Sequence, residues 1–156
     1  LLKYKNTRHG AAVFGPALAG VWMEYLGEPI HFISGTVLVV PVPLARKRLR
    51  MRGYNQSELL AKALLSNLPC GASPTVLDTE LLEKYVETKA QADITHRDAR
   101  LKNLGACFRV RKGRVARGET IVLVDDVTTT GATFAACRMA LEDAGFRRIF
   151  AIAIAH

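Results

Sequence analysis

The sequence predicts an α/β fold: a mostly parallel, twisted, Rossmann-like sheet with helices on both faces. Segments with strand and helix patterns alternate along the chain, which is typical of parallel sheets. The run TVLVVPVP at residues 36–43 is continuously apolar and β-branched, like a strand buried on both faces. With 156 residues, 49% of them hydrophobic, the chain is long enough for a real core, so a single domain is expected over residues 1–156.

The first half of the chain predicts a helix on either side of this strand. A moderately amphipathic helix is expected over residues 11–26, ended by Gly27. Its expected core positions are Val13, Ala17, Val21 and Met23. After the strand and a basic stretch, Asn55 and Glu58 form a capping-box-like start of a second helix. That helix continues with Leu60, Ala63, Leu64 and Leu68 at helical spacing.

The second half predicts short strands followed by a βαβ unit. A short strand is expected at residues 80–83, and Thr95 is a candidate cap for a short helix in the polar stretch after it. Residues 106–119 are expected to form two strands that turn near Lys112 and Gly113. The βαβ unit then consists of a strand at 120–125, a helix at 133–144 closed by Gly145, and a strand at 148–155.

The composition favours an anionic partner. Lys and Arg together number 22 against 14 for Asp and Glu, a formal net charge of +8, which suits phosphate or nucleic acid. Cys70, Cys107 and Cys137 are isolated and odd in number, so they build neither a disulfide framework nor a CxxC zinc site. This usage favours the reducing cytoplasm. Cys107 and Cys137 lie among apolar residues and are expected in the core.

The sequence predicts neither membrane insertion nor a signal peptide. The longest apolar stretch, residues 11–26, is interrupted by Pro16 and Glu24 and falls short of the ~20 apolar residues that span a bilayer. Because the chain begins with Leu1 rather than Met, it is expected to be a piece of a longer protein.

The stretch IVLVDDVTTTGATFAA at residues 121–136 places acids, threonines and a glycine between a strand and a helix. In open α/β sheets, ligands bind beyond the carboxyl ends of the strands, where a helix N-terminus offers unpaired N–H groups. Gly131 would let a phosphate approach the backbone, and three hydroxyl donors surround it: Thr129, Thr130 and Thr133. The spacing matches neither a P-loop nor GxGxxG, so an ordinary nucleoside triphosphatase or dinucleotide-binding fold is disfavoured.

Asp125 and Asp126 lie just before this phosphate cradle. Carboxylates would repel a phosphate unless they contact a neutral polyol attached to it or a bound cation, and a ribose 5-phosphate meets both conditions. Because neighbouring side chains of a strand point to opposite faces, the two acids can share one ligand only where the strand already turns into the loop. The alternative interpretation is a strand that ends in a polar turn, with Asp and Thr serving only as helix caps.

The segment VLVDDVTTTGAT resembles the signature of the type I phosphoribosyltransferases. This resemblance implies a mostly parallel sheet with a small variable hood, and it assigns Asp125 and Asp126 to the ribose hydroxyls of phosphoribosyl pyrophosphate. It implies that Mg²⁺ is held mostly by substrate and water, with the same two acids as protein ligands. VVPVPL stands where the family has its pyrophosphate loop, which assigns Pro43, Leu44 and Arg52 to pyrophosphate. The 5-phosphate would lie against Thr128, Thr129, Thr130, Gly131, Ala132 and Thr133.

Three stretches together resemble the ComF group of phosphoribosyltransferase-like proteins almost end to end: PVPLARKRLRMRGYNQSELLAKAL, QADITHRDARLKNLGACF and the signature. Members of that group typically carry a small zinc module before this domain, which this sequence does not contain, and are linked to DNA uptake or the use of external DNA. The resemblance makes residues 84–103 an active-site lid, with Lys89 and Arg100 stabilising charge on pyrophosphate. A plain surface connection is the alternative.

The basic residues between positions 46 and 52 have two interpretations. They could form a solvated loop, or they could surround pyrophosphate or a nucleic-acid backbone. The sequence does not decide between the two.

Together these inferences predict a protein that binds phosphoribosyl pyrophosphate with Mg²⁺ and transfers phosphoribose to a nitrogen acceptor, releasing pyrophosphate. The protein would act in the uptake and use of DNA or in nucleotide salvage. The sequence does not identify the nitrogen acceptor. The alternative is a non-catalytic protein that senses nucleotides or handles single-stranded DNA with the competence machinery. Between them lies a regulator that binds phosphoribosyl pyrophosphate without turnover. Formation of a homodimer through the helix at 11–26 is a further hypothesis, with core packing as its alternative.

Overall fold

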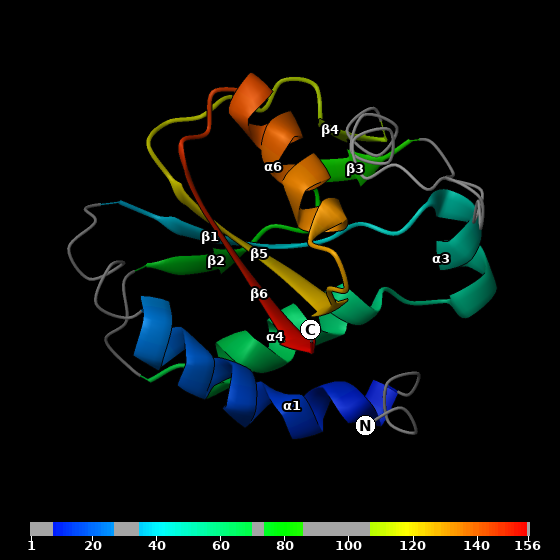
Figure 1. Ribbon diagram of the computed structural model, residues 1–156, viewed down its shortest axis with the longest axis vertical. Helices are drawn as coiled ribbons and strands as arrows, with labels where there is room; N and C mark the ends of the chain where they lie inside the picture. Colours follow the sequence, from blue (N-terminus) through cyan, green and yellow to red (C-terminus); the bar gives the residue numbers. More distant parts are fainter. Residues whose placement is uncertain (1–7, 27–34, 70–73, 86–106, 156) are drawn as a thin grey trace.

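The computed structural model describes residues 8–26, 35–69, 74–85 and 107–155. Among these residues, the main sheet has four parallel strands in the order β2–β1–β5–β6, and β3 and β4 form a separate antiparallel pair (Figure 1). The strands are β1 (Val37–Pro41), β2 (Thr75–Leu77), β3 (Leu82–Lys84), β4 (Phe108–Val110), β5 (Thr120–Val127) and β6 (Arg148–Ala155). The helices are α1 (Arg8–Val21), which continues into the π-helical turn η1 (Trp22–Leu26), α3 (Arg46–Arg52), α4 (Gln56–Asn67) and α6 (Ala132–Asp143).

Helices cover both faces of the sheet, which confirms the predicted fold class. In Figure 1, α1 and α4 lie below the sheet and α6 lies above it. Side chains of β1 and β5 alternate between two core clusters. Val39 and Val124 pack with α1 and α4, whereas Val40 and Leu123 pack with α6. The continuous apolar run of β1 is therefore a strand buried on both faces, as the sequence indicated.

The predicted core face of α1 is wrong. Val13, Val21 and Met23 are exposed, Val13 by 64%, and Ala17 is exposed as well. The buried positions are Ala11, Leu18, Ala19, Trp22 and Leu26. The reason is a close approach of α1 to α4 at Gly15, where an added Cβ would lie 2.9 Å from the carbonyl oxygen of Ala63. Gly15 therefore faces α4, and the rotation that this contact requires leaves Val13, Val21 and Met23 in solvent.

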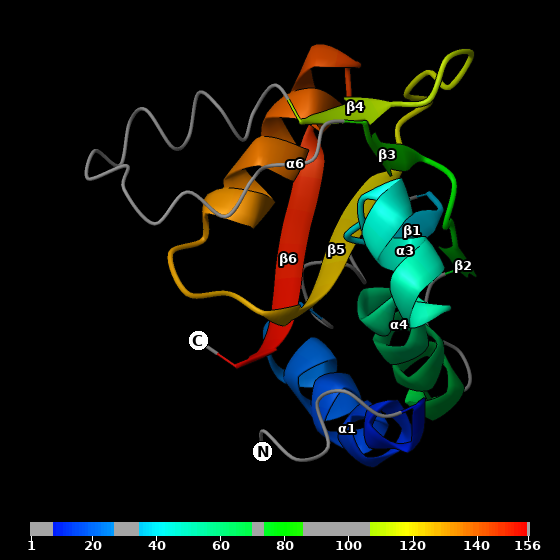
Figure 2. The ribbon, with the colours of Figure 1, turned by 90° about the vertical axis from the view of Figure 1, so that its right-hand side faces the viewer.

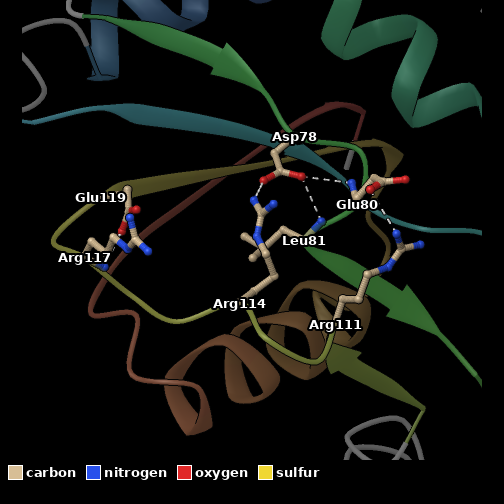
Figure 3. Close-up of polar contacts among 7 residues, drawn as sticks. All are labelled: Asp78, Glu80, Leu81, Arg111, Arg114, Arg117 and Glu119. Carbon is tan, nitrogen blue, oxygen red and sulfur yellow. Dashed lines mark hydrogen bonds and ion pairs between the residues drawn. The ribbon is translucent and has the colours of Figure 1, made fainter.

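The expected pair of strands within residues 106–119 is also wrong. β4 pairs with β3, with Lys84 opposite Phe108, and not with the residues after the turn at 112–113. The strand expected at 80–83 begins at Leu82, because the Asp78 carboxylate accepts hydrogen bonds from the amides of Glu80 and Leu81, each at 2.9 Å (Figure 3). These hydrogen bonds hold the chain in a turn until Leu82.

Other differences from the predicted elements are small. The basic stretch after β1 is the helix α3 rather than a loop, and it ends at Gly53, which has a left-handed φ of 74°. The strand predicted at 36–43 ends at Pro41, whereas β5 continues two residues beyond its predicted end. The helix expected near Thr95 lies outside the described residues. No helix in the described ranges is both long and apolar enough to cross a membrane.

Candidate functional site

The carboxyl ends of β1, β5 and β6 bring the predicted loops together at one edge of the sheet. β1 and β5 pair in parallel up to Pro41 and Val124, and the amide of Val42 donates to the Val124 carbonyl at 2.9 Å. The amide of Thr128 donates to the Ala155 carbonyl of β6 at 3.0 Å. Residues 43–44, which follow β1, therefore begin beside the strand that carries the acids. This is the edge where open α/β sheets bind ligands.

Asp125 and Asp126 lie within β5 rather than in the loop after it. β5 pairs Asp125 with Ala153 and Val127 with Ala155, so the strand runs past both acids. A ligand shared by both acids was expected only where the strand already turns into the loop, and in this structure the strand turns later. Because side chains of a strand alternate in direction, a ligand that touches both carboxylates would have to reach across the strand end.

The environment of Asp125 is unusual for a carboxylate. Burial raises its pKa to about 6, and the nearby Asp126 carboxylate also raises it. Hydrogen bonds from the Ser57 hydroxyl at 2.8 Å and from the Asp126 amide at 2.9 Å favour the charged form and oppose this rise. Asp125 is therefore mostly ionised at neutral pH but becomes protonated in mild acid. The Asp126 carboxylate accepts a hydrogen bond from the Val127 amide at 2.9 Å.

The start of α4 connects the loop after β1 to Asp125. Asn55 caps α4 by accepting a hydrogen bond from the Ser57 amide at 3.2 Å, and its own amide group donates to the Val42 carbonyl at 3.0 Å. The first turn of α4 therefore contacts both Val42, directly after β1, and the carboxylate of Asp125. Sequence analysis identified Asn55 only as a cap and did not identify Ser57. The position of Ser57 in the first turn of a capped helix could have suggested a role for it. Its hydrogen bond to Asp125 is apparent only from the fold.

Gln56 is a second buried polar residue at this helix start. Its side chain is 6% exposed, and its Oε1 has no hydrogen-bond partner among the described residues. A buried acceptor without a donor costs about 1–3 kcal/mol. This atom is the kind of group that a bound ligand or water satisfies.

The Thr-Gly loop after β5 is a compact turn that leads into α6. The Gly131 amide donates to the Thr128 hydroxyl at 3.0 Å, and the Ala132 amide donates to the Thr130 hydroxyl at 3.4 Å. Gly131 has a left-handed φ of 69°, which explains why glycine stands there. The amides of Thr133 and Phe134, in the first turn of α6, make no hydrogen bond with any described residue. Together with the exposed Thr129 hydroxyl, they are donors available to an anion.

The donor set fits Mg²⁺ only if a ligand supplies most of the coordination. No group of three or more His, Cys, Asp or Glu side chains that could hold a metal exists among the described residues. Asp125 and Asp126 offer hard carboxylate oxygens, and Mg²⁺ commonly binds through one or two carboxylates together with phosphates and water. The residues present are therefore compatible with a substrate-bound Mg²⁺.

A cationic cavity of about 430 Å³ lies between α3 and the β3–β4 pair. Five basic side chains and Glu83 line it, together with Ala45 and Tyr85; the basic ones are Arg46, Lys47, Arg50, Lys84 and Arg109. Burial lowers the pKa of Lys84, and the Asp125 charge acts on Lys84 in the opposite direction. Lys84 is therefore the cavity residue that the Asp125 charge acts on. Sequence analysis did not single out Lys84 as a site residue.

The remaining predicted residues fall in different places. Pro43 and Leu44 are half-buried at the β1 exit, whereas Arg52 is exposed at the end of α3 and does not line the cavity. Lys89 and Arg100, the predicted lid cations, lie outside the described residues. Cys107 and Cys137 are buried, as predicted. Burial raises the pKa of Cys137 to about 12, which suits an inert core thiol.

Comparison with known proteins finds homologues that are competence and DNA utilization proteins. The competence protein ComFC of Bacillus subtilis is 34% identical over 103 residues, which are 66% of this chain and 35% of that protein. The DNA utilization protein YhgH of Escherichia coli is 37% identical over 97 residues, 62% of this chain and 39% of that protein. Competence protein F of Haemophilus influenzae is 31% identical over 123 residues, 76% of this chain and 50% of that protein. The matches thus span half or less of these relatives, and no protein-family model matches the chain.

Proposed function

Because the chain is homologous to the ComF group of phosphoribosyltransferase-like proteins, we propose that it binds phosphoribosyl pyrophosphate with Mg²⁺ and acts in the uptake or use of DNA. One observation carries the ligand assignment. Two acids of β5, the Thr-Gly turn into α6 and the loop after β1 all meet at one edge of the sheet. In phosphoribosyl pyrophosphate, a neutral ribose lies between the 5-phosphate and the pyrophosphate. The two acids likewise lie between the Thr-Gly turn and the loop after β1, the two elements proposed to bind phosphate.

Each part of the ligand has a proposed set of residues. The ribose hydroxyls donate to Asp125 and Asp126. The 5-phosphate accepts hydrogen bonds from the loop at 128–133 and from the free amides at the start of α6. Pyrophosphate lies at Pro43 and Leu44, with Arg52 as a further contact. Asp125 and Asp126 would hold Mg²⁺ mainly through water, and the ion would neutralise part of the pyrophosphate charge.

The proposed reaction is transfer of phosphoribose to a nitrogen acceptor. The C1–O bond of the ribose breaks and its electron pair leaves with pyrophosphate, while a nitrogen lone pair forms the new bond to C1 and the nitrogen loses a proton. Positive charge grows on the ribose, and the carboxylates of Asp125 and Asp126 stabilise it. Negative charge grows on pyrophosphate, and Lys89 and Arg100 are the cations proposed to stabilise it from the lid.

Thermal unfolding tests the ligand assignment. We expect phosphoribosyl pyrophosphate with Mg²⁺ to raise Tm, because a ligand that binds only the folded state stabilises it. Ribose 5-phosphate should raise Tm less, and Thr129→Val/Thr130→Val should reduce both effects. An equal rise with pyrophosphate alone would contradict a site for the whole molecule. Release of pyrophosphate in the presence of ammonia or a nitrogen base then tests the transfer reaction separately.

A non-catalytic role in handling DNA is the second candidate function. The cationic cavity and the names of the relatives favour it. Binding of phosphoribosyl pyrophosphate without release of pyrophosphate, whatever acceptor is supplied, would support this candidate over the transferase.

A further inference from the structure

We infer that the exposed side of α1 is a dimerisation surface, on which α1 of a second copy of this chain packs in the antiparallel direction. We call this surface the α1 face and define it by Val13, Ala17 and Val21, with Met23 and Glu24 at its end in η1. The inference goes beyond the proposed function, because it uses none of the residues assigned to phosphoribosyl pyrophosphate. In Figure 1 and Figure 2, α1 lies at the lower margin of the molecule, and the sheet lies above it.

The α1 face has the sequence pattern of a buried surface. Val13, Ala17 and Val21 follow one another at intervals of four residues, which places them along one side of the helix. All three are exposed, and Met23 beyond them is 48% exposed. From Gly10 to Met23 the sequence has no charged residue. A helix that is apolar on all sides is typical of a buried helix, so a partner is expected on this face.

The other side of α1 is already part of the core. Leu18 and Trp22 are each 2% exposed and belong to the cluster that α1 shares with α4 and the sheet. Gly15 marks the close approach to α4 on this side. The helix therefore has two apolar sides, one packed within the domain and one exposed on its surface. Burial of the exposed side against another molecule would be favourable.

A second copy fits the α1 face because the apolar pattern is symmetric about Ala17. Val13 and Val21 each lie four residues from this alanine. In an antiparallel pair of helices centred on Ala17, each Val13 lies beside Val21 of the second copy, and the two alanines meet at the two-fold axis. The small alanine side chains allow the helices to approach closely. These contacts bury apolar surface and bring no like charges together.

The ends of the helix are complementary in the same orientation. α1 begins with Arg8 and His9, and its first turn has no acidic residue to balance the positive end of the helix dipole. In the pair centred on Ala17, Glu24 lies opposite Gly10 of the second copy, within that first turn. The carboxylate of each copy is thus placed at the positive helix end of the other. A parallel pair would instead place the two Glu24 carboxylates beside each other.

The charge pattern favours a second copy over an anionic membrane surface. Helices that lie on membranes carry Lys and Arg beside their apolar side, whereas residues 10–26 contain no basic residue. With a formal net charge of +8, two copies of the chain repel each other unless their contact avoids the cations. The α1 face is a surface where such a contact is possible.

Sedimentation equilibrium over about a hundredfold range of concentration tests the inference. A single pair of helices is a small interface, so we expect a dimer of twice the chain mass of 17.1 kDa with a micromolar Kd. Val13→Lys/Val21→Lys places like charges opposite each other and should weaken dimerisation at least about tenfold. Val13→Lys/Val21→Glu places opposite charges there in the antiparallel pair and should dimerise at least about tenfold more tightly than the double-lysine variant.

The same variants distinguish the orientation and the surface. In a parallel pair, Val13→Lys/Val21→Glu would bring like charges together at both positions, so loss of its dimer would contradict the antiparallel arrangement. The matched control is Val115→Lys/Met139→Lys, which adds two positive charges at exposed apolar positions outside α1 and should leave the dimer unchanged. Thermal unfolding of every variant checks that it is folded.

Oxidative cross-linking locates the centre of the pair. Ala17→Cys should give a disulfide-linked dimer, because the two sulfur atoms would meet at the two-fold axis. Val13→Cys should not, since the antiparallel pair holds its two copies about 12 Å apart along the helix. The natural sequence, with its own cysteines, is the control for both variants. Cross-linking of Val13→Cys in preference to Ala17→Cys would contradict the proposed centre.

Three results would overturn the inference as a whole. The first is a monomer at every concentration, and the second is a dimer that weakens equally in Val13→Lys/Val21→Lys and in the control. The third is binding of the monomer to phosphatidylglycerol vesicles that is lost in the double-lysine variant, which would assign the α1 face to lipid. Phosphoribosyl pyrophosphate with Mg²⁺ should still raise Tm of the double-lysine variant, so failure of the dimer leaves the proposed function standing.

Discussion

The hydroxyl of Ser57 donates a hydrogen bond of 2.8 Å to the Asp125 carboxylate, from a helix 68 residues earlier in the chain. Ser57 is only 3% exposed, and the cap residue Asn55 fixes the helix turn that carries it. The bond counteracts the effect of burial on Asp125 and favours its charged form. A residue outside the signature thus contacts an acid within it and favours the charged form of that acid.

Removal of this hydroxyl should raise the pKa of Asp125 above about 6, because the bond that stabilises the charged form is lost. In Ser57→Ala, the proposed binding of phosphoribosyl pyrophosphate with Mg²⁺ should therefore weaken at a higher pH than in the natural protein. Calorimetry across the range from about pH 5 to 8 measures the shift. Ser57→Thr should restore the natural profile, and Ser66→Ala, on the exposed side of α4, should leave it unchanged. An unchanged profile in Ser57→Ala would show that the bond does not control the acid.

Asp125→Asn should stabilise the protein at neutral pH. The pKa of Asp125 rises from 3.8 to about 6 on folding, so the protonated carboxyl favours folding below pH 3.8 and this stability is lost as the pH rises through about 6. The difference corresponds to about 3 kcal/mol. In urea unfolding, Asp125→Asn should exceed the natural protein in free energy of unfolding by up to about 3 kcal/mol at pH 7 and match it near pH 4. The exposed Asp143→Asn serves as the control, and a gap that does not depend on pH would contradict the assignment.

Gly131→Ala and Gly20→Ala should change stability in opposite directions. An added Cβ has no neighbour within 4 Å at either position, so only backbone conformation separates them. Gly131 has a φ of 69°, where alanine costs about 1–2 kcal/mol. Gly20 lies inside α1, where alanine should gain up to about 1 kcal/mol. Urea unfolding measures both, and stabilisation by Gly131→Ala would show that the turn does not need a left-handed residue.

The sheet was predictable because its patterns are local. The apolar run around Val39 and Val40 and the order of strand, helix and strand at the end of the chain indicate a parallel sheet without further information. The face that α1 buries was not predictable, because it depends on the close approach at Gly15, which only the packed pair of helices reveals. The pairing of β4 with β3 was likewise not predictable, since 21 undescribed residues separate Tyr85 from Cys107 in the sequence.

The candidate site also has a part that was predictable from the sequence and a part that was not. Asp125, Asp126 and the Thr-Gly loop are contiguous, so their order alone suggested a ribose phosphate. Ser57 is remote in sequence from the signature, and its hydrogen bond to Asp125 depends on a fold that brings α4 to this edge of the sheet. That a polar residue such as Gln56 is buried becomes apparent only from the folded structure.

Calorimetric titration of phosphoribosyl pyrophosphate with Mg²⁺ tests the central claim most directly. The natural protein and the double variant Asp125→Asn/Asp126→Asn would be compared, with the exposed Asp143→Asn as a control. We expect saturable binding in the natural protein and in Asp143→Asn, and its loss in the double variant. Absence of binding at millimolar ligand in a folded sample, or equal binding in all three proteins, would contradict the assignment of this sheet edge to phosphoribosyl pyrophosphate.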